Sequence, residues 1–102
     1  MMNGNYGPEV YRVAGEALGA VGASSEHVEA SFRKAIALAR ARQVVAFELR
    51  AGISLAMLLA RRGERDAAAA MLRRIYAVFG EGFQTSDLRR ARGLLDSLRA
   101  SA

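Results

Sequence analysis

The 102-residue sequence has no cysteine, no tryptophan, one proline and one histidine. The absence of cysteine excludes disulfides, thiolate zinc sites and a cysteine nucleophile, and it leaves His27 as the only imidazole. β-Branched and aromatic residues are few, whereas alanine (21) and leucine (11) are abundant, which favours helices over strands. A chain of this length has room for one domain. The composition therefore predicts a single all-α domain and excludes most catalytic chemistry.

Negative charge is also scarce, because ten Asp and Glu face 15 Lys and Arg and the net charge is +5. A basic balance favours acidic partners such as nucleic acid. However, the arginine runs fall on the polar faces of predicted helices, and the aromatic residues fall in or beside apolar stripes. We therefore expect a solvated basic surface rather than a nucleic-acid interface. A basic, helical nucleic-acid-binding protein is the alternative.

No targeting or membrane segment is visible in the sequence. Residues 1–7 are polar and glycine-rich, without the cationic start and apolar run of a secretion signal, and we expect them to be disordered. No stretch of about 18 residues is free of charge. We expect a cytoplasmic protein that does not associate with membranes.

Apolar residues recur at helical spacing in five segments separated by glycine or small polar residues. They predict two helical hairpins over residues 8–42 and 44–79 and a capping helix over 86–100, all within one domain of residues 8–100. Pro8 suits a first helical position, and Gly63 suits a left-handed helix stop. The segment 44–62 is apolar on nearly every side, so it must lie centrally. Arg89, Arg90, Arg92 and Arg99 of the last helix are expected to face outward.

The two predicted hairpins resemble each other. Residues of the first helix match the third at an offset of 41, and residues of the second match the fourth at an offset of 40. The matched repeat positions are Tyr11, Ala14, Gly15 and Leu18 with Gly52, Leu55, Ala56 and Leu59, then Val28, Phe32 and Ala35 with Ala68, Leu72 and Ile75. This large and small pattern resembles the tetratricopeptide repeat, a helical hairpin of 34 residues. It implies longer helices than the standard repeat and an antiparallel, superhelical stack of hairpins. Ile75 departs from the small residue that the pattern requires.

A second resemblance covers roughly residues 29–98. The strings FELRAGISLAMLL at 47–59 and YAVFGEGFQTSDLRRARGLLDSL at 76–98 are similar to the C-terminal helical repeats of large bacterial regulators. Those regulators carry a signal-transduction ATPase module after an adenylate or guanylate cyclase domain or a winged-helix DNA-binding domain. The C-terminal signature comprises Glu81, Gly82, Phe83, Thr85, Asp87 and Leu88, with Ser86 where such proteins usually have proline. The resemblance implies a regulatory scaffold role and supplies no active-site residue.

Few residues qualify for chemistry. His27 has no second histidine or cysteine at ligand spacing, so we interpret it as a surface residue. Glu48 begins the most apolar helix and is expected to form a structural ion pair with Arg40 or Arg74. Gly15 and Gly52, inside helices, are expected to permit close helix packing. No phosphate loop or metal-ligand cluster is present, so we expect no catalytic, cofactor or metal residues and a protein that is not an enzyme.

The sequence therefore predicts a protein–protein interaction module whose stacked hairpins expose a concave groove for a peptide, another domain or an identical chain. A homodimer through the N-terminal hairpin is expected. Its basis is an apolar patch formed by Val10, Val13, Ala17 and Val21 with the side of the second helix around Ile36. A monomer whose patch awaits another partner is the alternative.

Overall fold

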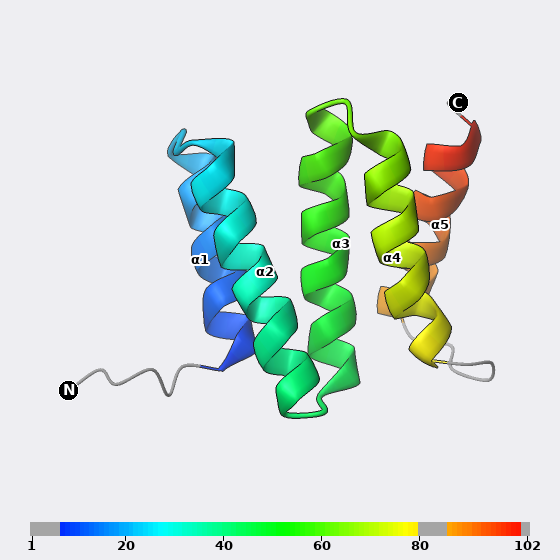
Figure 1. The fold of residues 1–102 in the computed structure, drawn as a ribbon, viewed down its shortest axis with the longest axis horizontal. Coiled ribbons are helices and arrows are strands. Elements are labelled where there is room, and N and C mark those ends of the chain that lie inside the picture. The colour runs from blue at the N-terminus through cyan, green and yellow to red at the C-terminus, as the bar shows by residue number, and fades with distance from the viewer. Residues whose placement is uncertain (1–6, 80–85, 101–102) are drawn as a thin grey trace.

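The computed structural model describes the backbone of residues 7–79 and 86–100 (Figure 1). The helices are α1 (Pro8–Ala20), α2 (Ser25–Ala41), α3 (Val45–Arg61), α4 (Arg65–Phe79) and α5 (Ser86–Ala100). Consecutive helices run in opposite directions (Figure 1). Within the described residues every regular element is a helix, which confirms the all-α prediction. The expected helix boundaries agree with these bounds to within about a residue.

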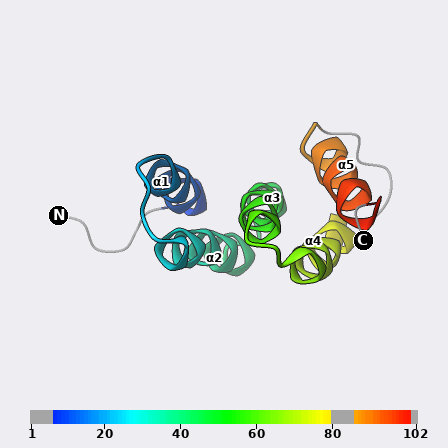
Figure 2. The same ribbon diagram turned by 90° about the horizontal axis from the view of Figure 1, so that it is seen from above.

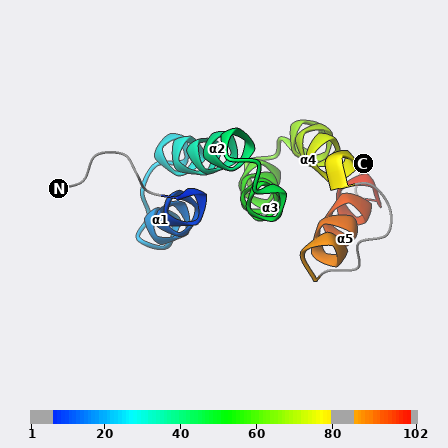
Figure 3. The same cartoon turned by 90° about the horizontal axis from the view of Figure 1, so that it is seen from below.

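The helices alternate between two sides of the molecule. Seen along the helix axes, α1, α3 and α5 lie on one side and α2 and α4 on the other (Figures 2 and 3). Helix α3 is central, because it contacts each of the other four helices. The radius of gyration of 13.4 Å matches the roughly 13 Å of a compact 100-residue domain.

Three connections repeat one helix-ending geometry. After α1, α2 and α3 the chain passes through a left-handed residue, namely Gly22 (φ 82°), Gln43 (φ 59°) and Gly63 (φ 85°). The next amide then donates to a carbonyl five residues back, from Ala23 to Leu18 at 2.9 Å and from Glu64 to Leu59 at 2.8 Å. Because the first and third connections are 41 residues apart, the backbone has the same repeat offset as the side chains.

The core forms around α3, as its apolar character predicts. Its sequence places small and large apolar residues on every side, and neighbouring helices cover most of them. Leu55 of α3 and Leu72 of α4 are both fully buried. The buried repeat positions are Gly15, Val28, Phe32, Ala35, Gly52, Leu55, Ala56, Leu59, Ala68, Leu72 and Ile75, with Leu88 from α5.

Two helical glycines allow close helix contacts, as expected. A Cβ atom built on Gly15 of α1 would lie 2.5 Å from Cε1 of Phe32 on α2. One built on Gly52 of α3 would lie 2.7 Å from Cδ1 of Ile75 on α4. The neighbouring side chains therefore occupy the space that a larger residue would need at either position.

Three sequence expectations about burial are wrong. The repeat pattern predicts that Ala14 and Leu18 are packed, but both are exposed, since no described helix covers that side of α1. The sequence predicts an exposed patch around Ile36, but Ile36 is buried in the core cluster because its side of α2 packs against α3. Glu81, Gly82, Phe83, Thr85 and residues 1–6 lie outside the described part of the chain. In the described residues no helix combines the length and apolarity needed to cross a membrane.

Candidate functional site

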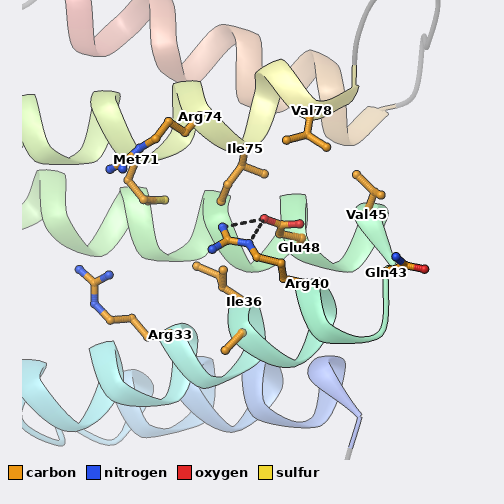
Figure 4. A pocket seen from close by; sticks show the side chains of 11 residues that line it. Arg33, Ile36, Arg40, Gln43, Val45, Glu48, Met71, Arg74, Ile75 and Val78 are labelled. Atoms are coloured by element: carbon orange, nitrogen blue, oxygen red, sulfur yellow. Dashed lines mark hydrogen bonds and ion pairs between the residues drawn. The ribbon is translucent and has the colours of Figure 1, made fainter.

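A groove of about 810 Å³ lies between α2 and α4, with α3 at its base (Figure 4). It follows from the alternation of sides, because α2 and α4 flank α3 without contacting each other directly. Side chains from α2, from the α2–α3 connection, from α3 and from α4 line it. The lining residues are Arg33, Ile36, Ala37, Arg40, Gln43, Val45, Glu48, Met71, Arg74, Ile75 and Val78.

The floor of the groove is apolar apart from the ion pair between Glu48 and Arg40. Ile36 from α2 and Ile75 from α4 are buried, while Val45 and Met71 are half-buried. Val78 of α4 is 63% exposed. An exposed valine beside half-buried apolar residues provides surface that a partner's apolar side chains can cover.

Arginines border this floor. Arg33 extends from α2 and Arg74 from α4, on opposite walls, and Arg40 of α2 points to Glu48 (Figure 4). Among the lining residues Glu48 is the only carboxylate, so the groove is basic. Arg33 already donates from Nε to Glu29 at 2.7 Å, so a partner's carboxylate is received by the remaining N–H groups of Arg33 and by Arg74, whereas the floor receives apolar groups.

The acid in the groove is already paired. Glu48 is 5% exposed, and its Oε2 accepts hydrogen bonds from Arg40 Nε at 3.0 Å and Arg40 Nη2 at 2.8 Å. Arg40 is one of the two partners expected from the sequence. A carboxylate this buried is costly without a partner, so the pair ties the end of α2 to the start of α3. Because the Arg40 side chain remains 66% exposed, it still faces the groove.

The opposite side, formed by α1, α3 and α5, is bridged by polar contacts. Arg50 of α3 donates from Nε to Asp87 of α5 at 2.8 Å and from Nη1 to Glu9 of α1 at 3.4 Å. The hydrogen bond from Arg12 lowers the pKa of Glu9, and the bond to Asp87 raises the pKa of Arg50. Ser54 donates to Glu16 at 2.8 Å. Asp87 of the C-terminal signature therefore joins α5 to the centre of the array.

His27 lies on the surface, as the sequence indicates. Its backbone amide donates to the capping Ser24 hydroxyl at 3.3 Å, and its Nδ1 lies 3.1 Å from the same oxygen. The ring therefore contacts the cap that begins α2. Among the described residues no three His, Asp or Glu side chains are placed to hold a metal ion together.

Sequence reasoning identified Glu48 and Arg40 but missed the groove that they share. Its walls have a readable signal, because the lining residues of α2 are spaced i, i+3, i+4, i+7 from Arg33, and those of α4 have the same spacing from Met71. Each wall therefore presents one helix face that mixes arginine with apolar side chains. That the two faces flank one depression depends on how α2 and α4 pack on α3, which spacing does not reveal.

Comparisons with protein-family models, with curated proteins and with solved structures each find no match to this chain. The groove and the internal repeat are the features of this chain that bear on its function.

Proposed function

We propose that this chain is a non-catalytic, regulatory protein–protein interaction module of the cytoplasm, built from tetratricopeptide-like hairpins. It resembles the C-terminal repeats of bacterial cyclase- or transcription-regulator-type ATPases. Two features support the repeat assignment. Helices alternate between two sides of the array (Figure 2), and the connections at Gly22 and Gly63 have the same geometry 41 residues apart. A repeat array of this kind acts by presenting a surface.

The groove between α2 and α4 carries the functional proposal. Its apolar floor and its arginines at positions 33, 40 and 74 suit a partner segment with apolar residues on one face and carboxylates beside them. An amphipathic, acidic helix satisfies both requirements, because its apolar face meets Val78 and Met71 while its carboxylates reach Arg33 and Arg74. The sequence predicts a groove formed by the stacked hairpins, and we propose that the groove between α2 and α4 is the binding site.

A model peptide tests this assignment. The probe is a fluorescein-labelled helical peptide with leucine at i, i+3, i+4 and i+7 and glutamate elsewhere, and the control peptide has lysine in place of glutamate. We expect saturable binding of the glutamate peptide, measured by fluorescence anisotropy. R74E should weaken it by about tenfold or more, because a charge contact becomes a repulsion. V78E should weaken it as well, since it places a charge on the floor.

Arg73 provides the matched control. It is the neighbour of Arg74 and is also exposed, but it does not line the groove, so R73E should leave binding unchanged. Equal losses in R73E and R74E, or equal affinity for the lysine peptide, would contradict the proposal. An oligonucleotide tested in parallel distinguishes this proposal from the alternative of a nucleic-acid-binding protein. Tight oligonucleotide binding that falls steeply with salt and is lost in both arginine variants would identify a nucleic-acid-binding protein instead.

A further inference from the structure

Helix α1 has two different faces. Pro8 and Gly15 are buried, and Gly15 lies against α2. An apolar stripe on another face has no cover within the described residues. Its large members are Val10, Val13, Leu18 and Val21, with exposed fractions of 48%, 54%, 36% and 79%. Ala14 and Ala17 lie exposed between them. The spacing places Val10, Val13, Ala14, Ala17 and Leu18 along one side of the helix, and Val21 is its C-cap residue.

The repeat shows what such a stripe does when it is covered. At the offset of 41, Val13 and Val21 correspond to the polar residues Ser54 and Arg62. The other four, Val10, Ala14, Ala17 and Leu18, correspond to Ala51, Leu55, Leu58 and Leu59 of α3. Those four residues of α3 are at most 8% exposed. The preceding hairpin lies beside this side of α3, because Ser54, the counterpart of Val13, donates to Glu16 of α1 at 2.8 Å. The stripe on α1 is therefore the uncovered counterpart of an interface that the molecule already contains.

The stripe is also symmetric about its own midpoint. When two copies of α1 pair antiparallel about a two-fold axis midway between residues 15 and 16, a residue at position i meets position 31 minus i of the other copy. This rule pairs Val10 with Val21, Val13 with Leu18 and Ala14 with Ala17. Small residues thus meet at the crossing, where backbones approach, and larger apolar residues meet on both flanks. None of the six is charged, so nothing in the stripe opposes its own copy.

We propose that the chain forms a two-fold homodimer through this stripe of α1, with the second copy as its occupant. An isologous contact requires a surface complementary to itself, which the symmetric stripe provides. Because no residue of α1 lines the groove between α2 and α4, the dimer leaves both grooves accessible. The proposal is therefore independent of what the groove binds.

Light scattering and sedimentation equilibrium on the full chain, from low to hundreds of micromolar, test the dimer. We expect the mass to rise from the chain mass of 11.0 kDa to twice that value. V13E should abolish the rise, because it places two carboxylates in the apolar contact. V78E is the matched control, since Val78 is a similarly exposed valine on α4, and this variant should dimerise normally. Circular dichroism should show equal helix content in both variants, since both positions are exposed.

A compensating variant tests the antiparallel pairing itself. In V13E/L18K the introduced carboxylate of each copy meets the introduced ammonium of the other, so at least part of the dimer should return, and it should weaken with added salt. A wild-type mass that stays at one chain at every concentration would overturn the proposal. Loss of the dimer in V78E as much as in V13E, or no recovery in V13E/L18K, would also overturn it. The peptide titration reports separately on the groove, because V13E should leave peptide binding intact.

Discussion

Gly52 of α3 and Ile75 of α4 fit each other so closely that a Cβ atom at position 52 would lie 2.7 Å from Cδ1 of Ile75. The first hairpin has Tyr11 and Ala35 at the corresponding positions. At these two positions, therefore, the second hairpin has the smaller residue on its first helix and the larger residue on its second helix. The exchange explains why Ile75 departs from the small residue of the repeat pattern, since the missing side chain of Gly52 provides the space.

The first prediction is a coupling between these two positions. G52A gains up to about 1 kcal/mol of helix propensity but loses about 1–3 kcal/mol to overpacking, so we expect net destabilisation. I75V removes the Cδ1 atom and should cost about 0.5–1.5 kcal/mol alone, but less in the G52A background. Urea unfolding of the four proteins measures the cycle. Costs that add within about 0.5 kcal/mol would show that the two residues do not compete for one space.

Gly15 should tolerate alanine less well than Gly93 does. A Cβ atom on Gly15 meets the rigid ring of buried Phe32, whereas one on Gly93 of α5 meets nothing within 4 Å. G15A is expected to lower the stability by about 1–3 kcal/mol, reduced by the gain in helix propensity. G93A should raise it by up to about 1 kcal/mol. Thermal melts provide the comparison, and a melting temperature of G15A at or above that of G93A would contradict the close contact.

Gln43 offers a site for stabilisation. It has the same left-handed conformation as Gly22 and Gly63, but with a side chain, at a strain of about 1 kcal/mol or more. Q43G should therefore stabilise the fold, by less than this because glycine also gains freedom in the unfolded chain. G63Q should destabilise it by a similar strain. The result that would contradict this reading is a chemical-denaturation midpoint that falls in Q43G and is unchanged in G63Q.

Acid should weaken the contact between α2 and α3 made by Glu29. The hydrogen bond from Arg33, followed by one from Arg62 of the α3 C-cap, holds the pKa of Glu29 below its ordinary value. A lowered folded-state pKa means that this stabilisation is present above the unfolded value of about 4.3 and is lost as the pH falls below it. E29Q should therefore be less stable than the parent at pH 7, by at most about 1 kcal/mol, and the gap should close in acid.

Salt provides the control for Glu29, because the three side chains remain partly exposed to solvent. The gap between E29Q and the parent at pH 7 should shrink in 1 M salt, where the screening length is only about 3 Å. Stability curves against pH that run parallel for the two proteins would exclude a contribution from the Glu29 charge.

The sequence was sufficient for the helices and for most of the core because local patterns set both. Pro8, the cap at Ser24 and the left-handed glycines mark helix ends, and the all-round apolarity of residues 44–62 indicates the central position of α3. The sequence has no such signal at the end of α2, because glutamine seldom adopts the left-handed backbone conformation that Gln43 has here. Gln43 is held in this conformation by the hydrogen bond from the amide of Val44 to Ala39 O at 2.9 Å.

The groove and the burial of α1 could not be predicted from spacing alone. Ala14 and Leu18 match buried residues of α3, but burial depends on a neighbouring hairpin, and periodicity reports a face without saying what covers it. Ile36 shows the opposite error, because it is buried in the core cluster where α2 packs against α3, and spacing alone does not reveal that packing. The ion pair of Glu48 could be predicted from the sequence, because a charge at the start of an apolar helix requires a nearby partner.

The central place of α3 affects how the molecule opens. In most repeat arrays each unit contacts only its neighbours, so segments can unravel from an end. Here α1, α2, α4 and α5 all pack against α3, and none can separate without exposing part of it. The backbone amides of α3 should therefore exchange their hydrogens with solvent only when the whole chain unfolds, and those of α1 and α5 by smaller, local openings. The slowest amides in α3 would then report the global free energy of unfolding directly.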